Sequence, residues 1–298
     1  MKLGVEPGRY IVAVSGGVDS MALLDLLSRL PKVELVVAHF NHGIRPDSRE
    51  DEKLVAEAAA AYGLPFEAGY GELGAGASEE TARRARYGFL KQVRKKYGAR
   101  AIITAHHQDD LIETAIINLL RGTGRRGLVA ISSSKDILRP MLGYTKARIL
   151  DYAQEKNLKW REDSTNQSPD YLRNYIRQNI MPKVTPAMRR QFLRQIGKIQ
   201  DAAPRIDSWL EELAGTVSRG GDIDRGRFSA LPSELGNELL MHWLRRSGLK
   251  DFDKRTINRL NVAIRTSKPG SRHPVKAPFE IEVGAKSVRF KRAGQNAS

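Results

Sequence analysis

The chain of 298 residues contains no cysteine. This absence excludes disulfides, thiolate zinc sites, cysteine-ligated iron–sulfur clusters and cysteine nucleophiles. The chain also lacks any apolar run close to the ~20 residues of a membrane-spanning helix, and residues 1–10 lack the apolar segment of a signal peptide. We therefore expect a cytoplasmic protein that makes no contact with a membrane.

Acidic residues are too few to balance the basic ones. The chain has 34 Asp and Glu against 50 Lys and Arg, which gives a net charge of +16. Residues 82–100 carry eight basic residues and no acid, and residues 171–200 carry seven and no acid. Such runs are often only solvated helix faces, but in a chain this basic they favour a polyanionic partner such as RNA.

Hydrophobic periodicity predicts an α/β fold. Strands are expected at 10–14, 33–39, 64–70 and 100–105, alternating with helices at 18–30, 48–62 and 78–98. This alternation predicts a parallel, Rossmann-like sheet with helices on both faces and a site at the carboxyl ends of its strands.

A second, smaller domain is expected after the sheet. Helices at 109–120, 145–157 and 171–180 are predicted within the first domain, and the second is expected to contain helices at 187–217 and 233–246 and a short β-like segment at 279–291. Pro182 and Pro186 interrupt the pattern. We therefore predict a catalytic domain over 1–184 and a mainly helical, RNA-binding domain over 185–298.

The most informative segment lies at residues 11–20, IVAVSGGVDS. An apolar strand runs into a glycine turn and then into a helix that starts on small polar residues. Backbone N–H groups at such a turn, beside the positive end of a helix dipole, bind phosphate or pyrophosphate. Asp19 places a carboxylate beside that anion, which indicates Mg²⁺ between the two. No Walker motif occurs in the chain.

Two more polar segments follow predicted strands. His39, Asn41, His42 and Arg45 follow the second strand and suit a ribose or a phosphate. Asp110 and Glu113, three residues apart at a helix start, share one face. Acids favour the first turn of a helix because of its dipole, which is one explanation of the pair. The other is that the two carboxylates grip an ammonium group.

Several motifs together resemble a known family. The segment S-G-G-V-D-S is similar to the pyrophosphate loop (PP-loop) of the N-type ATP pyrophosphatases, which use ATP to adenylate a carbonyl oxygen. The order of the further motifs resembles the tRNA(Ile)-lysidine synthases over residues 10–180. These motifs are AHFNHGIR at 38–45, ETARRARYGFL at 80–90, TAHHQDDLIET at 104–114, NLLRGTGRRGL at 118–128, RPML at 139–142, EDSTN at 162–166 and RNYIR at 173–177.

The resemblance implies a reaction. Such enzymes adenylate the wobble cytidine of an isoleucine tRNA with the anticodon CAU, release pyrophosphate, and then let free L-lysine displace AMP. ATP and Mg²⁺ would be required.

The resemblance also implies roles for residues. Asp19, Asp110 and Glu113 would be catalytic, with Mg²⁺ held by Asp19 through the phosphates. Asp110, Glu113 and Arg177 would bind lysine, and Arg173 competes with Arg177 for that role. ATP would contact Ser15, Gly16, Gly17, Val18, Asp19, Ser20 and His39. The tRNA would contact Arg83, Arg86, Arg121, Arg125, Arg126, Arg173, Arg189 and Arg190.

Other functions fit the sequence less well. PP-loop enzymes that add sulfur to tRNA need cysteines, which this chain lacks. An ammonia-using ligase similar to NAD or GMP synthetase would leave the basic runs unexplained, and a non-catalytic RNA-binding module would leave the glycine turn and the acidic pair without a purpose. The sequence does not fix the oligomeric state, and a homodimer is one option.

Overall fold

The computed structural model of the protein describes residues 1–43, 48–71, 79–121, 123–128, 131, 133–161, 172–249 and 252–292. The chain forms two units. The first contains residues 1–117 and 129–193, and the second contains residues 118–128 and 194–298. The predicted EDSTN motif at 162–166 lies outside the described residues.

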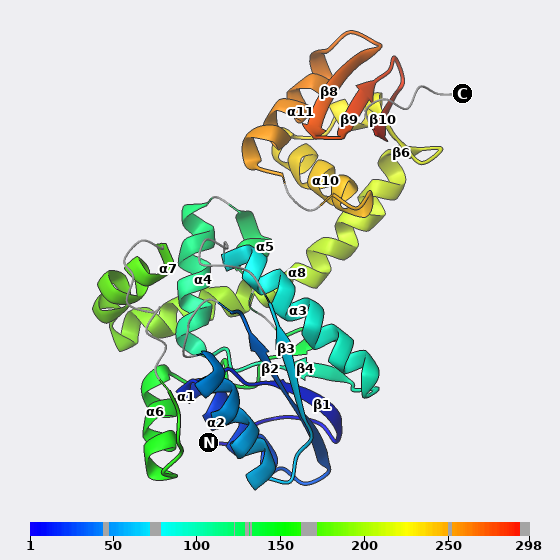
Figure 1. The fold of residues 1–298 in the computed structure, drawn as a ribbon. Coiled ribbons are helices and arrows are strands. Elements are labelled where there is room, and N and C mark those ends of the chain that lie inside the picture. Colours follow the sequence, from blue (N-terminus) through cyan, green and yellow to red (C-terminus); the bar gives the residue numbers. More distant parts are fainter. Residues whose placement is uncertain are drawn as a thin grey trace. The chain divides into compact units, whose positions relative to one another are not determined.

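The first unit is built on a parallel five-stranded sheet in the order β3-β2-β1-β4-β5 (Figure 1). Its strands are β1 (Gly8–Ala13), β2 (Val33–Asn41), β3 (Phe66–Tyr70), β4 (Ala101–Ile103) and β5 (Ile137–Leu138). The chain passes outward from β1 to β3 on one side and from β4 to β5 on the other. The order reverses between β1 and β4, and in such sheets ligands bind beyond the carboxyl ends of the strands at this point.

Helices cover both faces of this sheet, so its strands are buried on both sides. On one face Val12, Val37 and Ile103 pack against α1 (Val18–Ser28), α2 (Ser48–Ala61) and α6 (Lys146–Glu155). On the other face Ile11 and Ile102 pack against α3 (Glu79–Lys96). The alternation of neighbouring residues between two cores follows from the two-residue period of a strand.

The remaining helices of the first unit follow the sheet strands or lead away from them. Helix α4 (Gln108–Leu120) starts directly after β4, and its last residues belong to the second unit. A short α7 (Leu172–Tyr175) continues into a π-helical turn, η2 (Ile176–Ile180), and a 3-10 turn, η3 (Met181–Lys183). Helix α8 (Pro186–Val217) begins in the first unit and continues in the second.

The second unit combines helices with an antiparallel sheet in the order β6-β7-β10-β9-β8. Apolar residues of α10 and α11, such as Leu240 and Leu260, pack on Ile281 and Val288 of the sheet. The further elements are α5 (Gly124–Leu128), β6 (Ser218–Arg219), β7 (Asp222–Asp224), α9 (Arg225–Ser229), α10 (Ser233–Arg246), α11 (Lys254–Thr266), β8 (Ser271–Lys276), β9 (Phe279–Val283) and β10 (Ser287–Arg292).

The predicted fold class is confirmed: a parallel α/β domain precedes a smaller region with more helix than strand. Six elements of the second unit were missed, namely α5, β6, β7, α9, α11 and β8. Helix α11 carries a signal that could have revealed it, because Ile257, Leu260 and Ile264 recur at helical spacing after the N-cap Asp253. Strand β8 contains Pro274, which is tolerated here because β8 is an edge strand.

The two observed units do not divide the chain at one residue, whereas the predicted domains 1–184 and 185–298 do. Residues 118–128 belong to the second unit. Arg125 and Arg126 tie this segment to α8, since a nitrogen of each lies 2.6 Å from Oδ1 of Asp207. As a division of functional roles, the boundary at residue 184 stays a prediction.

Among the described residues, no helix is long and apolar enough to cross a membrane.

Candidate functional site

The glycine turn after β1 is a rigid loop closed by its own serines. Ser20 Oγ accepts a hydrogen bond from the backbone N–H of Ser15 at 3.1 Å and donates one to the carbonyl of Gly17 at 2.9 Å. Gly16 has a φ of +92°, a conformation that favours glycine. Gly17 is the N-cap of α1. The first N–H groups of a helix have no intrahelical acceptor, so the loop presents donors to an anion.

A cavity of about 420 Å³ lies against this loop. Ser15, Gly17, Asp19 and Ser20 line it from the β1 side, and Asp110 lines it from the α4 side. A volume of this size is within the range of about 300–1,000 Å³ found for small-molecule sites. The structure thus brings the predicted phosphate loop and part of the predicted acidic pair to one cavity at the point where the strand order reverses.

His39, predicted to contact ATP, also lines the cavity from β2. Its ring is buried, and Nδ1 lies 2.9 Å from the carbonyl oxygen of Val14. Burial lowers the pKa of His39, although the Val14 carbonyl opposes this effect. The neutral ring therefore donates to the carbonyl and supports the strand end from which the loop departs. Arg45 lies outside the described residues.

Asp110 caps the start of α4. Its Oδ2 accepts a hydrogen bond from the backbone N–H of His107 at 2.9 Å, while His107 Nδ1 accepts one from the backbone N–H of Asp109 at 3.2 Å. This is the reciprocal arrangement of a capping box, with His107 in the N-cap position. The helix-start explanation of the acids is thus correct for Asp110, and its other oxygen, Oδ1, remains available to lie 3.5 Å from Arg177.

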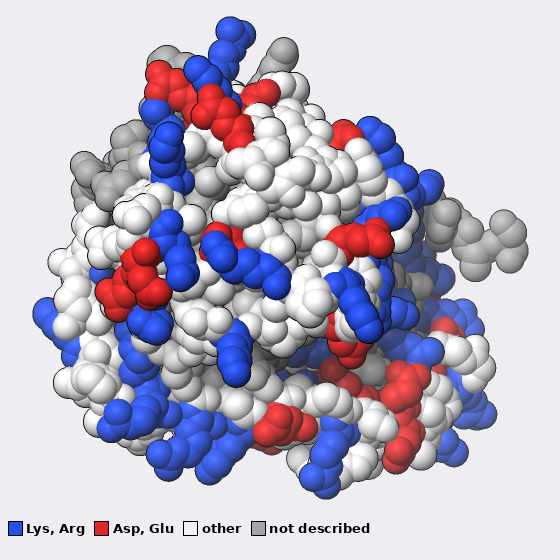
Figure 2. Space-filling view, turned by 90° about the horizontal axis from the view of Figure 1, so that it is seen from below, with Lys and Arg blue, Asp and Glu red and all other residues white. Residues whose placement is uncertain are grey.

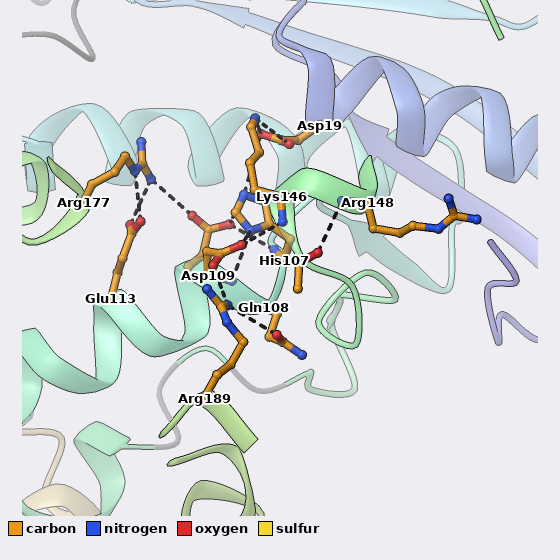
Figure 3. Close-up of polar contacts among 11 residues, drawn as sticks. Asp19, His107, Gln108, Asp109, Glu113, Lys146, Arg148, Arg177 and Arg189 are labelled. Atoms are coloured by element: carbon orange, nitrogen blue, oxygen red, sulfur yellow. Dashed lines mark hydrogen bonds and ion pairs between the residues drawn. The ribbon is translucent and has the colours of Figure 1, made fainter. Parts of the chain in front are cut away.

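Glu113 and Arg177 form a two-point ion pair (Figure 3). Arg177 Nε and Nη2 each donate to a carboxylate oxygen of Glu113 at 2.9 Å. The Glu113 side chain is only 2% exposed, and burial raises its pKa even though Arg177 acts in the opposite direction. The hydrogen bonds that Arg177 donates to Glu113 raise the pKa of Arg177. The three residues predicted to bind lysine are therefore adjacent, with Glu113 already paired.

The adjacent histidines have different surroundings. His106 lines the cavity, and its Nδ1 lies 2.8 Å from Oγ1 of Thr104. Burial, with the nearby Arg139, lowers the pKa of His106 to about 3. His107 is buried, and its Nε2 lies 3.3 Å from Oδ2 of Asp110. Nδ1 of His107 accepts the hydrogen bond from the Asp109 N–H, so Nε2 is the ring nitrogen that faces Asp110.

Lys146, which was not predicted, contacts the residue expected to hold the metal ion. Its Nζ lies 2.7 Å from both carboxylate oxygens of Asp19 (Figure 3). A second cation near the loop is Arg161, whose backbone N–H donates to the carbonyl of Gly16 at 3.0 Å and whose Nε lies 2.8 Å from Asp51. The signal for Lys146 in the sequence was a lysine in the first turn of a helix, where acids are preferred.

The arginines predicted to bind tRNA fall into two groups. Arg83, Arg121 and Arg190 are exposed, although Arg83 also lies over the ring of Tyr87. Others contact groups within their own unit: Arg189 lies 2.5 Å from Asp109, Arg173 lies 3.4 Å from Thr114, Arg125 and Arg126 share Asp207, and Arg86 lies over the ring of Tyr87 and lines the cavity. An RNA phosphate would have to compete with Asp207 and Asp109 for three of them.

Basic side chains also lie over a wide surface. Figure 2 shows one face of the molecule, on which Lys and Arg are spread across the whole view with smaller groups of Asp and Glu among them. Both signs are interspersed, so this face offers a distributed positive field rather than a single basic patch.

Comparison with known proteins identifies the domain around this cavity. A family model described as the PP-loop domain matches residues 3–184. The solved structure of the U34-tRNA thiolase NcsA from Methanococcus maripaludis, with its [4Fe-4S] cluster, has a TM-score of 0.53, 17% sequence identity, and a match over 66% of this chain and 74% of its own. At this identity the likeness shows a shared fold alone.

Curated relatives narrow the family. The tRNA(Ile)-lysidine synthase of Chlorobaculum tepidum is 31% identical over 98% of this chain and 94% of its own length. The enzyme of the same name from Thermotoga maritima is 40% identical over 72% of this chain. The match spans 53% of that relative, which is about half its length. These matches show that the chain belongs to the tRNA(Ile)-lysidine synthase family, within the larger group that shares the PP-loop domain.

Proposed function

We propose that this protein joins free L-lysine to the wobble cytidine of an isoleucine tRNA with the anticodon CAU, after ATP has adenylated that cytidine. The observation that carries the proposal is the cavity shared by the glycine loop of β1 and the acidic start of α4. One segment suits a triphosphate and the other suits an ammonium group. The family membership of the chain supports the same reaction.

In the first step the 2-carbonyl oxygen of the cytosine attacks the α-phosphorus of ATP, and pyrophosphate leaves. The backbone donors of Ser15–Ser20 would stabilise the charge that develops on the leaving group, because they are positioned before the reaction starts. Asp19 is a hard oxygen donor that lines the cavity and fits Mg²⁺ bound to the phosphates, an ion that would neutralise part of their charge. Among the described residues, no cluster of acids and histidines could hold the ion without the phosphates.

In the second step the ε-amine of lysine displaces AMP. Because Arg177 already neutralises the buried Glu113, Asp110 is the carboxylate placed to meet the incoming ammonium. Glu113 would then act by holding Arg177 in place. Nε and Nη2 of Arg177 already bind Glu113, so the donors that remain on its guanidinium would meet the carboxylate of the lysine substrate.

The lysine amine must lose a proton before it can attack. With an ordinary pKa of 10.4, about 3.4 pKa units, or roughly 4.6 kcal/mol, separate it from the neutral amine at pH 7. Burial lowers the pKa of His106 to about 3, so this ring is no better a base than a carboxylate. Asp110 lines the cavity and is the carboxylate placed to meet the ammonium, so we propose that it accepts the proton during the attack.

Three alternatives are less well supported. A sulfur-transfer enzyme would need thiolates, and the chain has none. An ammonia-using ligase does not account for the family match over nearly the whole chain. A non-catalytic RNA-binding module does not account for a cavity shared by a phosphate loop and an acidic helix start. We further propose that residues 1–184 carry the chemistry and that residues 185–298 contribute to tRNA binding.

The test is a reconstituted reaction. The purified protein is incubated with ATP, Mg²⁺, labelled lysine and an isoleucine tRNA transcript with the anticodon CAU. We expect tRNA-dependent release of AMP and acid-stable lysine on the RNA, and neither with a transcript whose wobble cytidine is replaced by uridine. Ammonia-dependent formation of NAD or GMP, or no turnover of ATP, would contradict the proposal. Light scattering would decide between a monomer and the homodimer that the sequence leaves open.

A further inference from the structure

Lys146 occupies a position that the reaction outlined above does not yet use. Its ammonium group bridges both oxygens of Asp19, each at 2.7 Å. The two side chains are partly exposed, 44% for Lys146 and 28% for Asp19, so neither is locked in the core. Asp19 also lines the cavity beside the glycine loop. The ammonium therefore lies against a carboxylate that lines the cavity beside the loop.

The backbone of Lys146 is anchored independently of its side chain. Its N–H donates to Oδ2 of Asp109 at 2.7 Å, and Oδ1 of Asp109 lies 2.5 Å from Arg189. Thr145 caps the same helix by accepting from the N–H of Arg148. The start of α6 is thus fastened to the start of α4. Lys146 can exchange its partner at Nζ while its backbone stays in place.

The position of Lys146 also breaks a local preference. The first turn of α6 contains no acid and begins with Lys146, although the positive end of a helix dipole disfavours cations. Such local conflicts occur where function requires them. The neighbouring α1 also directs its first turn, with Asp19, at this cavity. A cation here is suited to a site that must accept several negative charges.

We propose that Lys146 is a catalytic residue of the adenylation step, a role that rests on the proposed function. When ATP binds, the ammonium leaves Asp19 and donates a hydrogen bond to the oxygen that links the α- and β-phosphates. A bond forms between the cytosine oxygen and the α-phosphorus, and the bond from that phosphorus to the bridging oxygen breaks. The bridging oxygen keeps the electron pair, and Lys146 remains protonated and stabilises that charge. Its departure frees Asp19 for the Mg²⁺ that accompanies the nucleotide.

The first test measures pyrophosphate release with tRNA and ATP but without lysine, which isolates adenylation. Loss of a single preorganised donor to a developing oxyanion lowers kcat by about 10²–10³-fold. We expect Lys146→Met to lower kcat by about 100-fold, with the KM for ATP changed by less than about threefold, because the contact strengthens in the transition state. Lys146→Arg should recover part of the rate. A kcat of Lys146→Met close to wild type would overturn the proposal.

The matched control is Arg148, another cation in the first turn of α6, whose side chain points away from Asp19 (Figure 3). Arg148→Met should retain the wild-type rate. An equal loss in both variants would mean that the charge of the helix start matters rather than the ammonium on Asp19, and would overturn the proposal. Circular dichroism and thermal unfolding would establish that all variants are folded.

A second readout does not depend on activity. With a non-hydrolysable ATP analogue bound, whose phosphates supply the other ligands, Lys146 should compete with a divalent cation for Asp19. Electron paramagnetic resonance of Mn²⁺ should therefore show tighter binding to Lys146→Met than to wild type, and loss of the gain when Asp19→Asn is added. Equal binding to wild type and Lys146→Met would overturn the exchange. A wild-type protein without pyrophosphate release would defeat the proposed function, whereas an active wild type with an equally active Lys146→Met would defeat this inference alone.

Discussion

The glycine loop and the acidic half of the site are held together in different ways. The serines close the loop through hydrogen bonds between residues at most five apart in the chain, such as Ser15 and Ser20. Contacts from distant segments also reach the loop, because Arg161 donates to the Gly16 carbonyl and Lys146 pairs with Asp19. The acidic half instead depends on a buried ion pair between Glu113 and Arg177, 64 residues away. Substitutions in the loop should therefore affect chemistry more than stability, and substitutions in the acidic half should affect both.

The largest expected effect tests the loop. Asp19→Ala should lower tRNA-dependent AMP formation by about 10³-fold or more, since it removes the carboxylate expected beside the phosphates. Unfolding in urea should change by less than about 1 kcal/mol, because the Lys146 partner is partly exposed. Binding of tRNA in a filter assay should stay near wild type. Loss of RNA binding or of folding would show that Asp19 is structural and would remove the contrast.

The acidic half is tested through Arg177. In Arg177→Met the buried carboxylate of Glu113 loses its two-point partner, and we expect a loss of about 3 kcal/mol in the free energy of unfolding. Glu113→Gln should cost less, because the Arg177 side chain is 38% exposed. The double variant should be more stable than Arg177→Met. If Arg177→Met is as stable as wild type, the ion pair does not hold this half of the site.

The same variant should have a distinctive pH dependence. Burial raises the pKa of Glu113 in the folded protein above its ordinary value, so the folded state binds more protons than the unfolded chain between the two pKa values. Stability therefore falls as pH rises through that window. Removing Arg177, which acts to lower this pKa, should widen the window, and Arg177→Met should lose more stability at pH 8 than at pH 5. An equal loss at both values would contradict this explanation.

His106 should produce a smaller effect of opposite sign. Its pKa of about 3 lies below the ordinary value of 6.5, so the unfolded chain binds more protons between these values. The stability present above pH 6.5 should fall by about 1 to 2 kcal/mol by pH 5. His106→Gln should flatten this part of the curve, as measured by urea unfolding at pH 5, 6 and 7. An unchanged slope would mean that another group causes the acid sensitivity.

The smallest effects are expected on the basic surface. Removing the exposed Arg83 or Arg190 should reduce the slope of log Kd for tRNA against log salt by about 1 each if each contacts a phosphate. Removing Arg125 or Arg126 should change the slope less, because Asp207 already holds both. Filter binding at salt concentrations between about 50 and 200 mM KCl distinguishes the two groups of arginines. Equal slopes would show that Asp207 does not compete with RNA.

Much of the first unit could be predicted from its sequence. Helices α1 and α2 end within two residues of their expected positions, and β1 to β3 lie where apolar runs placed them. Helix 171–180 was expected as one α-helix, but it becomes α7 and a π-helical turn that carries Arg177. Such turns are frequent at functional sites, and no residue pattern announces them. Strand β5, Ile137–Leu138, is too short for its period to be recognised.

The sequence by itself determined the parallel sheet, the glycine turn before α1 and the excess of positive charge. Each follows from a short-range property: the period of apolar residues, the backbone freedom of Gly16, or a count of charges. Only the tertiary structure decided that Lys146 meets Asp19 and that Arg177 meets Glu113. These pairs join segments far apart in the chain, and their partners are selected by the packing of α6 and the π-helical turn beside the sheet rather than by any local pattern.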